Sequence, residues 1–340
     1  MCQFKRIFSC LFSFILSAGE VDHTLVWGHP LNNAVDELNL YYNNEIKIAL
    51  KNLPDNCDCR TAAGKILEHF GVTLNSPLEY WIKESSAIDK YPPVNMPQEE
   101  RYKNSIFKKR GSKAFELRQN FIFDYMIDEL ININGIYTGI DKLTHFTGSG
   151  YIYYRIYIQR LNQGDSPKDA IERSIMAGVT GEKTLLGRIA SGVFSFADLE
   201  ANFQGLTFAL DICRDNDPLL IKSARRWVLL KPFDIADYVN PYWDESYNPS
   251  FYYEGQNLTF LNKSETVSEN LPSFCEQYHS PPVQNLFKYY DELAIPSFSV
   301  KFLKKLILSG QIPDPASFDL RNICDKTENT QIPELQQNNP

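Results

Sequence analysis

The sequence predicts a mainly α-helical fold: a helical core with irregular extensions that are rich in aromatic residues and proline. Three observations support this prediction. Helix-forming segments recur along the chain and end at glycine or proline. Helix-capping residues precede two of them, and the irregular segment 232–253 combines aromatic residues with proline. Helices are predicted over residues 33–53, 61–70, 114–130, 141–161, 167–180, 284–293 and 297–308, with a further helix starting at 195.

The capping residues indicate where two of the central helices begin. Ser166 precedes Pro167, and proline is favoured in the first turn of a helix. Ser195 stands three residues before Asp198, a spacing close to that of a capping box. The chain then divides into a signal peptide (1–19), an N-terminal helical extension (20–138), a helical core with a candidate site (139–213), a C-terminal wrap with helices (214–324) and a disordered tail (325–340).

The composition excludes two classes of protein. Of the 340 residues, 43% are hydrophobic and 22% are charged, which is typical of a soluble domain. The net charge of −8 argues against nucleic acid as a partner, because nucleic-acid binding requires a concentrated basic surface. We also expect no transmembrane span, because no apolar run reaches the roughly 20 residues that cross a bilayer.

Residues 1–19 have the three-part pattern of a secretory signal. Lys5 and Arg6 give a basic start, residues 7–16 are mostly apolar, and residues 17–19 are small. A buried N-terminal helix is the alternative. The signal predicts a periplasmic or secreted protein, in which disulfides can form. Five cysteines follow it, so at least one thiol stays free or pairs with another chain: Cys57, Cys59, Cys213, Cys275 and Cys324.

Two segments of the core repeat one polar pattern. Asp141 and His145 are four residues apart, as are Asp198 and Asn202, and a glycine follows each pair after three residues. This spacing puts both members of a pair on one helical face. We expect Asp198 and Asn202 to point inward, where they need partners such as Asp141, His145 and Glu182. The opposite stripe, expected to face solvent, consists of Glu200, Gln204, Thr207 and Asp211.

This cluster supports two hypotheses. In the first, its side chains form a polar network that specifies packing, with the two aspartates near helix starts. In the second, they form a catalytic or metal site. His145 is then the general base or a ligand, Asp141 orients it, and Glu182 and Asp198 act as acid, base or ligands, with Asn202 on the same face. The sequence identifies no cofactor and no particular metal.

Two further candidates for metal binding are weaker. His23 and His29 lie near Asp22, but residues close to a mature N-terminus are usually exposed. Cys57 and Cys59 are two residues apart, and no second close pair of cysteines accompanies them.

The order of the polar residues resembles the signature of VanZ-like proteins and of a related bacterial family of predicted periplasmic lipoproteins of unknown function. The resemblance rests on Asp-Lys-x-x-His-Phe at 141–146, on Glu182, and on Ser-x-x-Asp-Leu-x-x-Asn-x-x-Gly at 195–205. VanZ-like proteins are small helical membrane proteins linked to glycopeptide-antibiotic tolerance, so the resemblance implies an envelope protein. Charged residues interrupt the apolar runs of this chain and argue against a membrane placement: Arg155, Arg160, Glu172, Arg173 and Arg188.

We therefore expect an exported bacterial cell-envelope protein. In one version it is a hydrolase that acts on a lipid or cell-wall component. In the other it is a non-catalytic binding or structural protein of the envelope, and the cluster is a packing network. A bound metal or a cleft that reaches His145 would favour the enzyme, whereas a sealed network would favour the second version.

Overall fold

The computed structural model describes residues 20–71, 76–108, 127–255 and 262–330. The predicted signal at 1–19 and residues 114–126 of one predicted helix lie outside them. Helices dominate the described chain, which confirms the prediction of a mainly α fold. None of the described helices is long and apolar enough to cross a bilayer.

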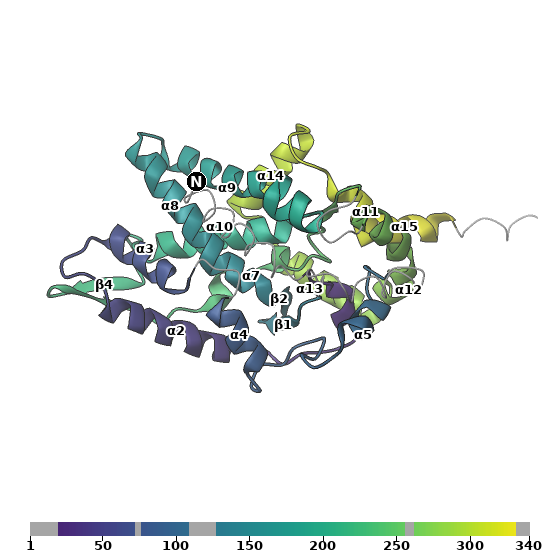
Figure 1. Cartoon of the computed structure of the whole chain (residues 1–340), viewed down its shortest axis with the longest axis horizontal. Helices are drawn as coiled ribbons and strands as arrows, with labels where there is room; N and C mark the ends of the chain where they lie inside the picture. Colours follow the sequence, from purple (N-terminus) through teal and green to yellow (C-terminus); the bar gives the residue numbers. More distant parts are fainter. Residues whose placement is uncertain (1–19, 72–75, 109–126, 256–261, 331–340) are drawn as a thin grey trace, which may run out of the picture.

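Figure 1 shows the order of the elements, with the central helices between an N-terminal group and a C-terminal group. The α-helices are α2 (Val35–Lys51), α3 (Cys59–His69), α4 (Pro77–Glu84), α5 (Gln98–Lys103), α7 (Ile140–Thr144), α8 (Gly150–Asn162), α9 (Pro167–Lys183), α10 (Phe196–Asp211), α11 (Lys263–Asn270), α12 (Cys275–Tyr278), α13 (Pro281–Leu293), α14 (Phe298–Leu308) and α15 (Leu320–Thr330). The π-helical turns are η2 (His145–Ser149) and η3 (Leu185–Ser191). The 3-10 turns are η1 (His23–Val26), η4 (Ile235–Asp237), η5 (Pro241–Trp243), η6 (Leu271–Phe274) and η7 (Pro315–Phe318).

The strands are short and form antiparallel pairs: β1 (Leu130–Ile133) with β2 (Ile136–Gly139), β3 (Val193–Phe194) with β6 (Phe251–Tyr252), and β4 (Leu220–Ser223) with β5 (Arg226–Leu229). The first pair corrects one prediction. The helix expected over 114–130 is wrong at its end, because Leu130 opens β1. Isoleucines on both sides of an Asn134-Gly135 turn, where both residues have positive φ, favour a hairpin over a helix.

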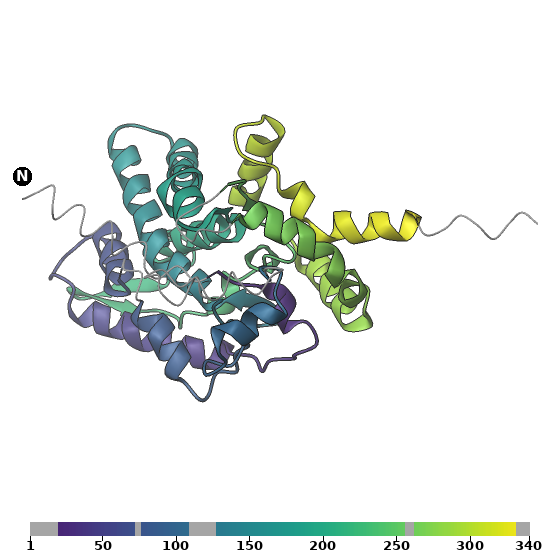
Figure 2. The same ribbon diagram turned by 45° about the vertical axis from the view of Figure 1, so that its right-hand side comes forward.

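The helices α8, α9 and α10 form the central layer and pack against one another (Figures 1 and 2). The helix predicted over 141–161 is present as a continuous run of α7, η2 and α8, with a π-helical turn inside it. Ser166 and Ser195 cap α9 and α10 as predicted, each accepting a hydrogen bond from the backbone N–H three residues later.

The segment after β5 wraps over this layer as an ordered but irregular chain. The rings of Tyr238 and Trp243 lie 5.4 and 5.9 Å from that of Phe146, which belongs to η2. Strand β6 then pairs with β3 immediately before α10 begins. The wrap therefore closes directly over the segments that carry the predicted polar cluster.

Two disulfides tie distant elements together. Cys59 bonds to Cys213 and joins α3 to the end of α10, and Cys275 bonds to Cys324 and joins α12 to α15. Cys57 is free among the described residues, in agreement with the odd number of cysteines after residue 19. Residues 325–330 continue α15 beyond its disulfide and do not belong to the disordered tail predicted at 325–340. Residues 331–340 lie outside the described chain.

Candidate functional site

The first half of the site is built by the hairpin and the helix that follows it. Gly139 ends β2 and caps α7, which places Asp141 in the first turn and His145 at the start of the π-helical turn. A side chain at position 139 would collide with Val21, whose Cγ1 lies 2.6 Å from the place of a Cβ atom, and with the Asp141 carboxylate. Single π-helical turns inside α-helices are frequent at functional sites.

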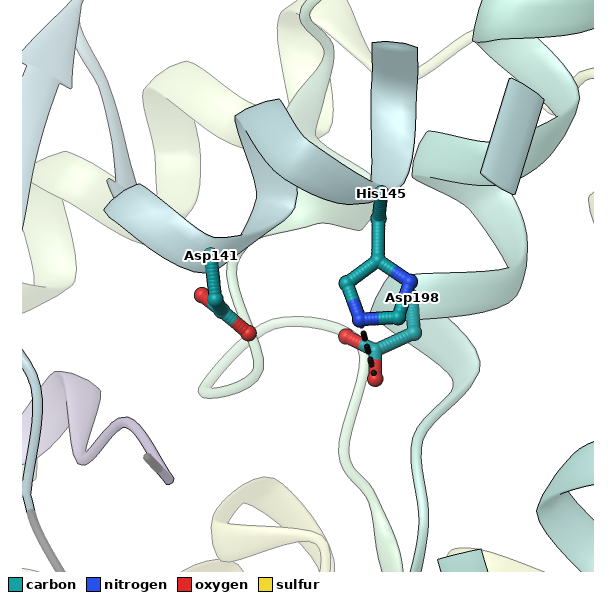
Figure 3. A group of neighbouring side chains, drawn as sticks. All are labelled: Asp141, His145 and Asp198. Carbon is teal, nitrogen blue, oxygen red and sulfur yellow. Dashed lines mark ion pairs between the residues drawn. The ribbon is translucent and has the colours of Figure 1, made fainter. Parts of the chain in front are cut away.

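The second half of the site is the first turns of α10. The hydroxyl of Ser195 accepts a hydrogen bond of 3.1 Å from the backbone N–H of Asp198 and fixes the start of the helix. Asn202 lies one turn further along the same face. Figure 3 shows the carboxylate of Asp198 directly beside the imidazole of His145, with Asp141 on the neighbouring helical turn.

The two repeated patterns face each other, as the spacing predicted. His145 Nδ1 lies 3.0 Å from Asn202 Oδ1, and His145 Nε2 lies 3.2 Å from Asp198 Oδ2. One potential ligand atom from each of Asp141, His145 and Asp198 lies within 4.8 Å of the others. The chain therefore brings four of the five predicted site residues together, and three of them have the side chains that commonly bind metal ions.

Glycines let the two helices approach this closely. A Cβ atom on Gly150 would lie 2.7 Å from the Cα of Gly205, and a Cβ on Gly205 would collide with the carbonyl of Phe146. The backbone of α10 thus touches that of η2 and α8 without intervening side chains. Gly148 and Gly205 are the two glycines of the repeated pattern. The backbone atoms closest to Gly205 belong to Gly150 and Phe146, and Gly148 is buried within η2.

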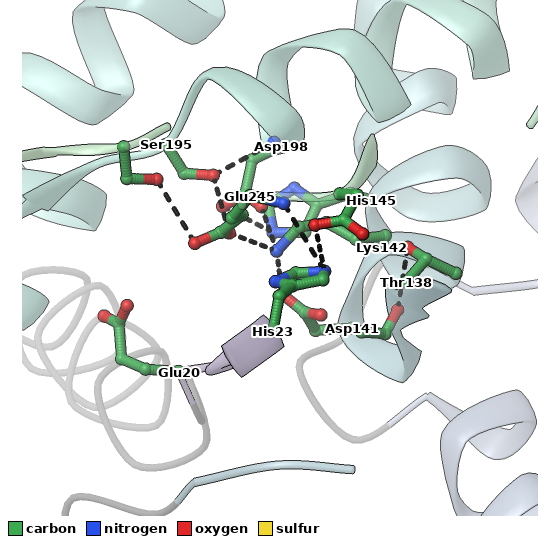
Figure 4. Close-up of polar contacts among 12 residues, drawn as sticks. Glu20, His23, Thr138, Asp141, Lys142, His145, Ser195, Asp198 and Glu245 are labelled. Atoms are coloured by element: carbon green, nitrogen blue, oxygen red, sulfur yellow. Dashed lines mark hydrogen bonds and ion pairs between the residues drawn. The ribbon is translucent and has the colours of Figure 1, made fainter. Parts of the chain in front are cut away.

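Lys142 is the centre of the charge network. Its side chain is 1% exposed, and its Nζ forms ion pairs with Asp141 Oδ2 (2.7 Å), Asp198 Oδ1 (2.8 Å) and Glu245 Oε1 (2.8 Å). Figure 4 shows the three carboxylates converging on this ammonium. Burial alone would lower the pKa of Lys142, but the three carboxylates outweigh it and raise the pKa well above its usual value.

Glu182 lies behind this network. Its Oε2 accepts a hydrogen bond of 3.1 Å from the backbone N–H of Ser195, and it is not among the atoms that could share a metal with His145. Burial, followed by the charge of Asp198, raises the pKa of Glu182 well above its usual value. Burial would also raise the pKa of Asp198, but the positive charges of His145 in its protonated form and of Lys142 lower it below the usual value. The pKa values of these two carboxyl groups thus move in opposite directions.

Sequence reasoning missed three residues of the network. In the sequence, Lys142 has no predicted role of its own beyond its place in the Asp-Lys-x-x-His-Phe motif. Its position one residue after Asp141 rotates its side chain by about 100° around the helix, toward the core. Glu245 comes from the wrap, where an acidic pair inside an aromatic segment was the available signal. His23, expected to be exposed, is 3% exposed, and its Nε2 accepts a hydrogen bond of 3.4 Å from the backbone N–H of Glu245.

The predicted solvent-facing stripe of α10 is wrong at Glu200. This carboxylate is fully buried and accepts hydrogen bonds from Gln204 (2.7 Å), Asn240 (3.0 Å) and Ser297 (2.7 Å). Asn240 belongs to the wrap and Ser297 caps α14, so segments remote in sequence cover this side of α10. Helical periodicity identified a polar face but not the elements that pack on it.

The cluster reaches solvent at one edge. The side chain of His145 is 29% exposed, and those of Asp198 and Asp141 are 15% and 18% exposed. Next to it, Thr144 donates a hydrogen bond to Glu79 of α4. Burial, then the charges of Asp128 and Asp141, outweigh this hydrogen bond and raise the pKa of Glu79 to about 7. The polar centre therefore reaches solvent at His145 and is not fully buried.

Among the described residues, the other candidates for metal binding are not part of a group with metal-ligand spacing. His29 stacks on Tyr91, with ring centroids 4.1 Å apart, and Cys59 is bonded to Cys213.

No family model matches the chain, and no curated protein or solved structure matches it. What the chain does therefore has to follow from the chemistry of its own side chains.

Proposed function

We propose that Asp141, His145 and Asp198 bind a divalent cation and that the chain is an exported hydrolase of the bacterial envelope, acting on a lipid or cell-wall component. The observation that carries this proposal is the surroundings of His145 Nε2. This nitrogen faces a carboxylate oxygen of Asp198 at 3.2 Å, while the other ring nitrogen is already engaged by Asn202.

The tautomer of His145 follows from that arrangement. Asn202 Oδ1 can only accept a hydrogen bond, so Nδ1 carries a proton and donates it. In the neutral ring, Nε2 then presents its lone pair to the lone pairs of Asp198, which repel it unless a cation lies between them. Two ligands bound to one ion at about 2.1 Å each are roughly 3.0–3.4 Å apart. The separation of 3.2 Å between Nε2 and Oδ2 fits a shared cation.

The charge around the cluster also favours a cation. Three carboxylates, those of Asp141, Asp198 and Glu245, share the single ammonium of Lys142, which leaves an excess of negative charge. The Oδ1 atom of Asp141 is buried and has no hydrogen-bond partner among the described residues. A buried carboxylate oxygen without a donor is costly, and a metal ion supplies the missing partner.

The residues then divide into three roles. Asp141, His145 and Asp198 are the ligands, and a cation held there would lower the pKa of a bound water so that it can attack an ester or phosphoester. Asn202 fixes the tautomer of His145, as hydrogen-bonded neighbours of metal ligands commonly do. Lys142 and Glu182 hold Asp198 and the start of α10 in place.

The envelope location and the substrate class rest on separate observations. The signal pattern at 1–19 and two disulfides support export, because disulfides persist in oxidising compartments. The resemblance to VanZ-like proteins at 141–205 supports an envelope protein, and lipids and cell-wall components are the substrates that an envelope hydrolase would meet. A hydrolase with these properties would act at the surface of the membrane or in the wall.

The alternative is a non-catalytic envelope protein in which the cluster is a packing network. The observation in its favour is Lys142, whose three ion pairs join α7, α10 and the wrap without any ligand. If Nε2 also carries a proton, His145 and Asp198 form an ordinary ion pair. The two functions differ in whether the purified protein binds a metal ion at His145.

Calorimetric titration of chelator-treated protein with Zn²⁺ and Mn²⁺ tests the proposal. We expect stoichiometric binding that His145→Ala and Asp198→Asn abolish. His69→Ala is the matched control, because His69 is exposed to a similar degree (27%) and pairs with Glu45 at 2.7 Å, outside this network. A wild type that binds neither ion, or variants that bind as the wild type does, would refute the metal site. A loaded protein that hydrolyses no ester or phosphoester in a substrate panel would leave a metal-binding protein without hydrolase activity.

A further inference from the structure

Helix α14 exposes a basic face. Lys301, Lys304, Lys305 and Leu308 recur at intervals of three and four residues and are all exposed, whereas Leu303 and Leu306 are buried on the opposite side. No acidic residue occurs in the sequence between Glu292 and Asp314. Among the described residues, none of the three lysines forms an ion pair. On a chain with a net charge of −8, this face is a local concentration of unpaired positive charge.

Large apolar side chains accompany this face. Leu308, at the end of α14, is 80% exposed, and Ile295, just before it, is 82% exposed. The loop after α14 is tied to the end of α9 by a hydrogen bond of 2.9 Å from Lys183 Nζ to the carbonyl of Gln311. The turn η3 follows Lys183 and exposes Leu186 and Ile189, so apolar residues of two neighbouring segments reach the surface.

The face is held rigidly on the helix that carries the candidate site. Phe298 of α14 stacks on Phe203 of α10, with ring centroids 6.3 Å apart. Ser297, the cap of α14, donates a hydrogen bond of 2.7 Å to the buried Glu200 of α10. Figure 1 shows α14 beside α9 and α10 at the periphery of the molecule. A partner bound to α14 is therefore kept at a fixed position relative to His145.

We propose that α14, with Ile295 and Leu308 at its ends, docks the protein on the surface of a bilayer that contains anionic lipid. Lysines above such a surface each contribute about 1 kcal/mol of attraction, and exposed leucine and isoleucine can insert between headgroups. Without the apolar side chains, the charges alone would fit any anionic polymer. This inference stands on the surface of α14 and does not depend on the metal site.

Flotation of the purified protein with vesicles tests the docking surface. We expect binding to vesicles of equal parts phosphatidylglycerol and phosphatidylcholine, no binding to pure phosphatidylcholine, and weaker binding as salt screens the charges. The double variant Lys301→Gln/Lys305→Gln should lower the partition coefficient roughly thirtyfold. The control Lys47→Gln/Lys51→Gln removes two exposed lysines with the same four-residue spacing from α2 and should leave binding unchanged.

The apolar part has its own variant. Leu308→Ser should weaken binding roughly tenfold, because an exposed leucine that inserts into the interface loses water contact on binding. The matched control is Ile48→Ser, which replaces an exposed apolar residue of α2. Absence of binding to the anionic vesicles, or equal losses in the α14 and α2 variants, would overturn the proposal. An unchanged Leu308→Ser variant would overturn insertion and indicate a purely ionic surface suited to an anionic polymer.

Discussion

Replacement of Lys142 by methionine is the sharpest single perturbation of the central network. Methionine has nearly the length and apolar volume of the lysine side chain but carries no charge. The substitution therefore leaves packing almost intact and removes the ammonium that Asp141, Asp198 and Glu245 share at 2.7–2.8 Å. The three carboxylates remain in place without their common partner.

The magnitude follows from the burial of this group. Lys142 is 1% exposed, so water does not replace it when it is removed. Breaking a buried ion pair by deleting one partner costs about 3–5 kcal/mol. We expect a loss of about 4 kcal/mol at neutral pH, which is a large part of the total stability of an ordinary domain. The loss should shrink in acid, because protonated carboxylates no longer repel one another.

Urea unfolding of the wild type and of Lys142→Met at neutral and acidic pH measures this loss of stability. Lys168→Met is the control: Lys168 is 69% exposed and lies 3.9 Å from Glu172, so its change should stay within about 0.5 kcal/mol. A loss below about 1 kcal/mol for Lys142→Met would show that the network contributes little and would refute the reasoning. A divalent cation should restore part of the lost stability, since it supplies the charge that methionine lacks.

Three further predictions concern other parts of the molecule. Gly205→Ala should destabilise the fold by about 1–3 kcal/mol in thermal unfolding, because the added Cβ meets the backbone of Gly150 and Phe146. The control is Gly64→Ala in helix α3, where the nearest atom to the added Cβ lies 3.5 Å away and no loss of stability is expected. The stability of Glu79→Gln relative to the wild type should rise between pH 4.5 and about 7 and then level off, because a carboxyl group whose pKa is raised in the folded state destabilises the wild-type fold as it ionises across that window. A stability difference that does not change with pH would contradict this. Protein from the envelope fraction should lack residues 1–19 by intact mass and offer Cys57 as its alkylatable thiol, whereas uncleaved cytosolic chain would disprove export.

The parts of the site predicted from sequence are those with a local signature. The spacing of Asp141 and His145, and of Asp198 and Asn202, sets the helical face on which each side chain lies. Capping by Ser195 sets where the second helix begins. Polar side chains that point inward need hydrogen-bonding partners, which predicts that the two helical faces meet. The distances from His145 to Asn202 (3.0 Å) and to Asp198 (3.2 Å) confirm this prediction.

The rest of the network has no local signature. Glu245 lies 50 residues after Ser195, and His23 lies 222 residues before Glu245, so only the wrap and the N-terminal segment bring them to the centre. The same holds for Glu200, whose partner Ser297 is 97 residues away. Helical periodicity gives the direction of a side chain relative to its own helix, but the elements that cover that face come from the tertiary fold.

The composition of the centre is difficult to explain by stability alone. A buried ammonium surrounded by three carboxylates is, in general, no more stable than apolar side chains of similar volume, because desolvation offsets the attraction between the charges. The chain nevertheless keeps a π-helical turn, a closely packed glycine pair and an excess of negative charge at the one edge where His145 is exposed. Departures from the rules of stable packing that gather at one accessible point are typical of functional sites. A site that admits a cation and a substrate has to open to solvent, and His145, at 29%, is more exposed than Asp141 or Asp198.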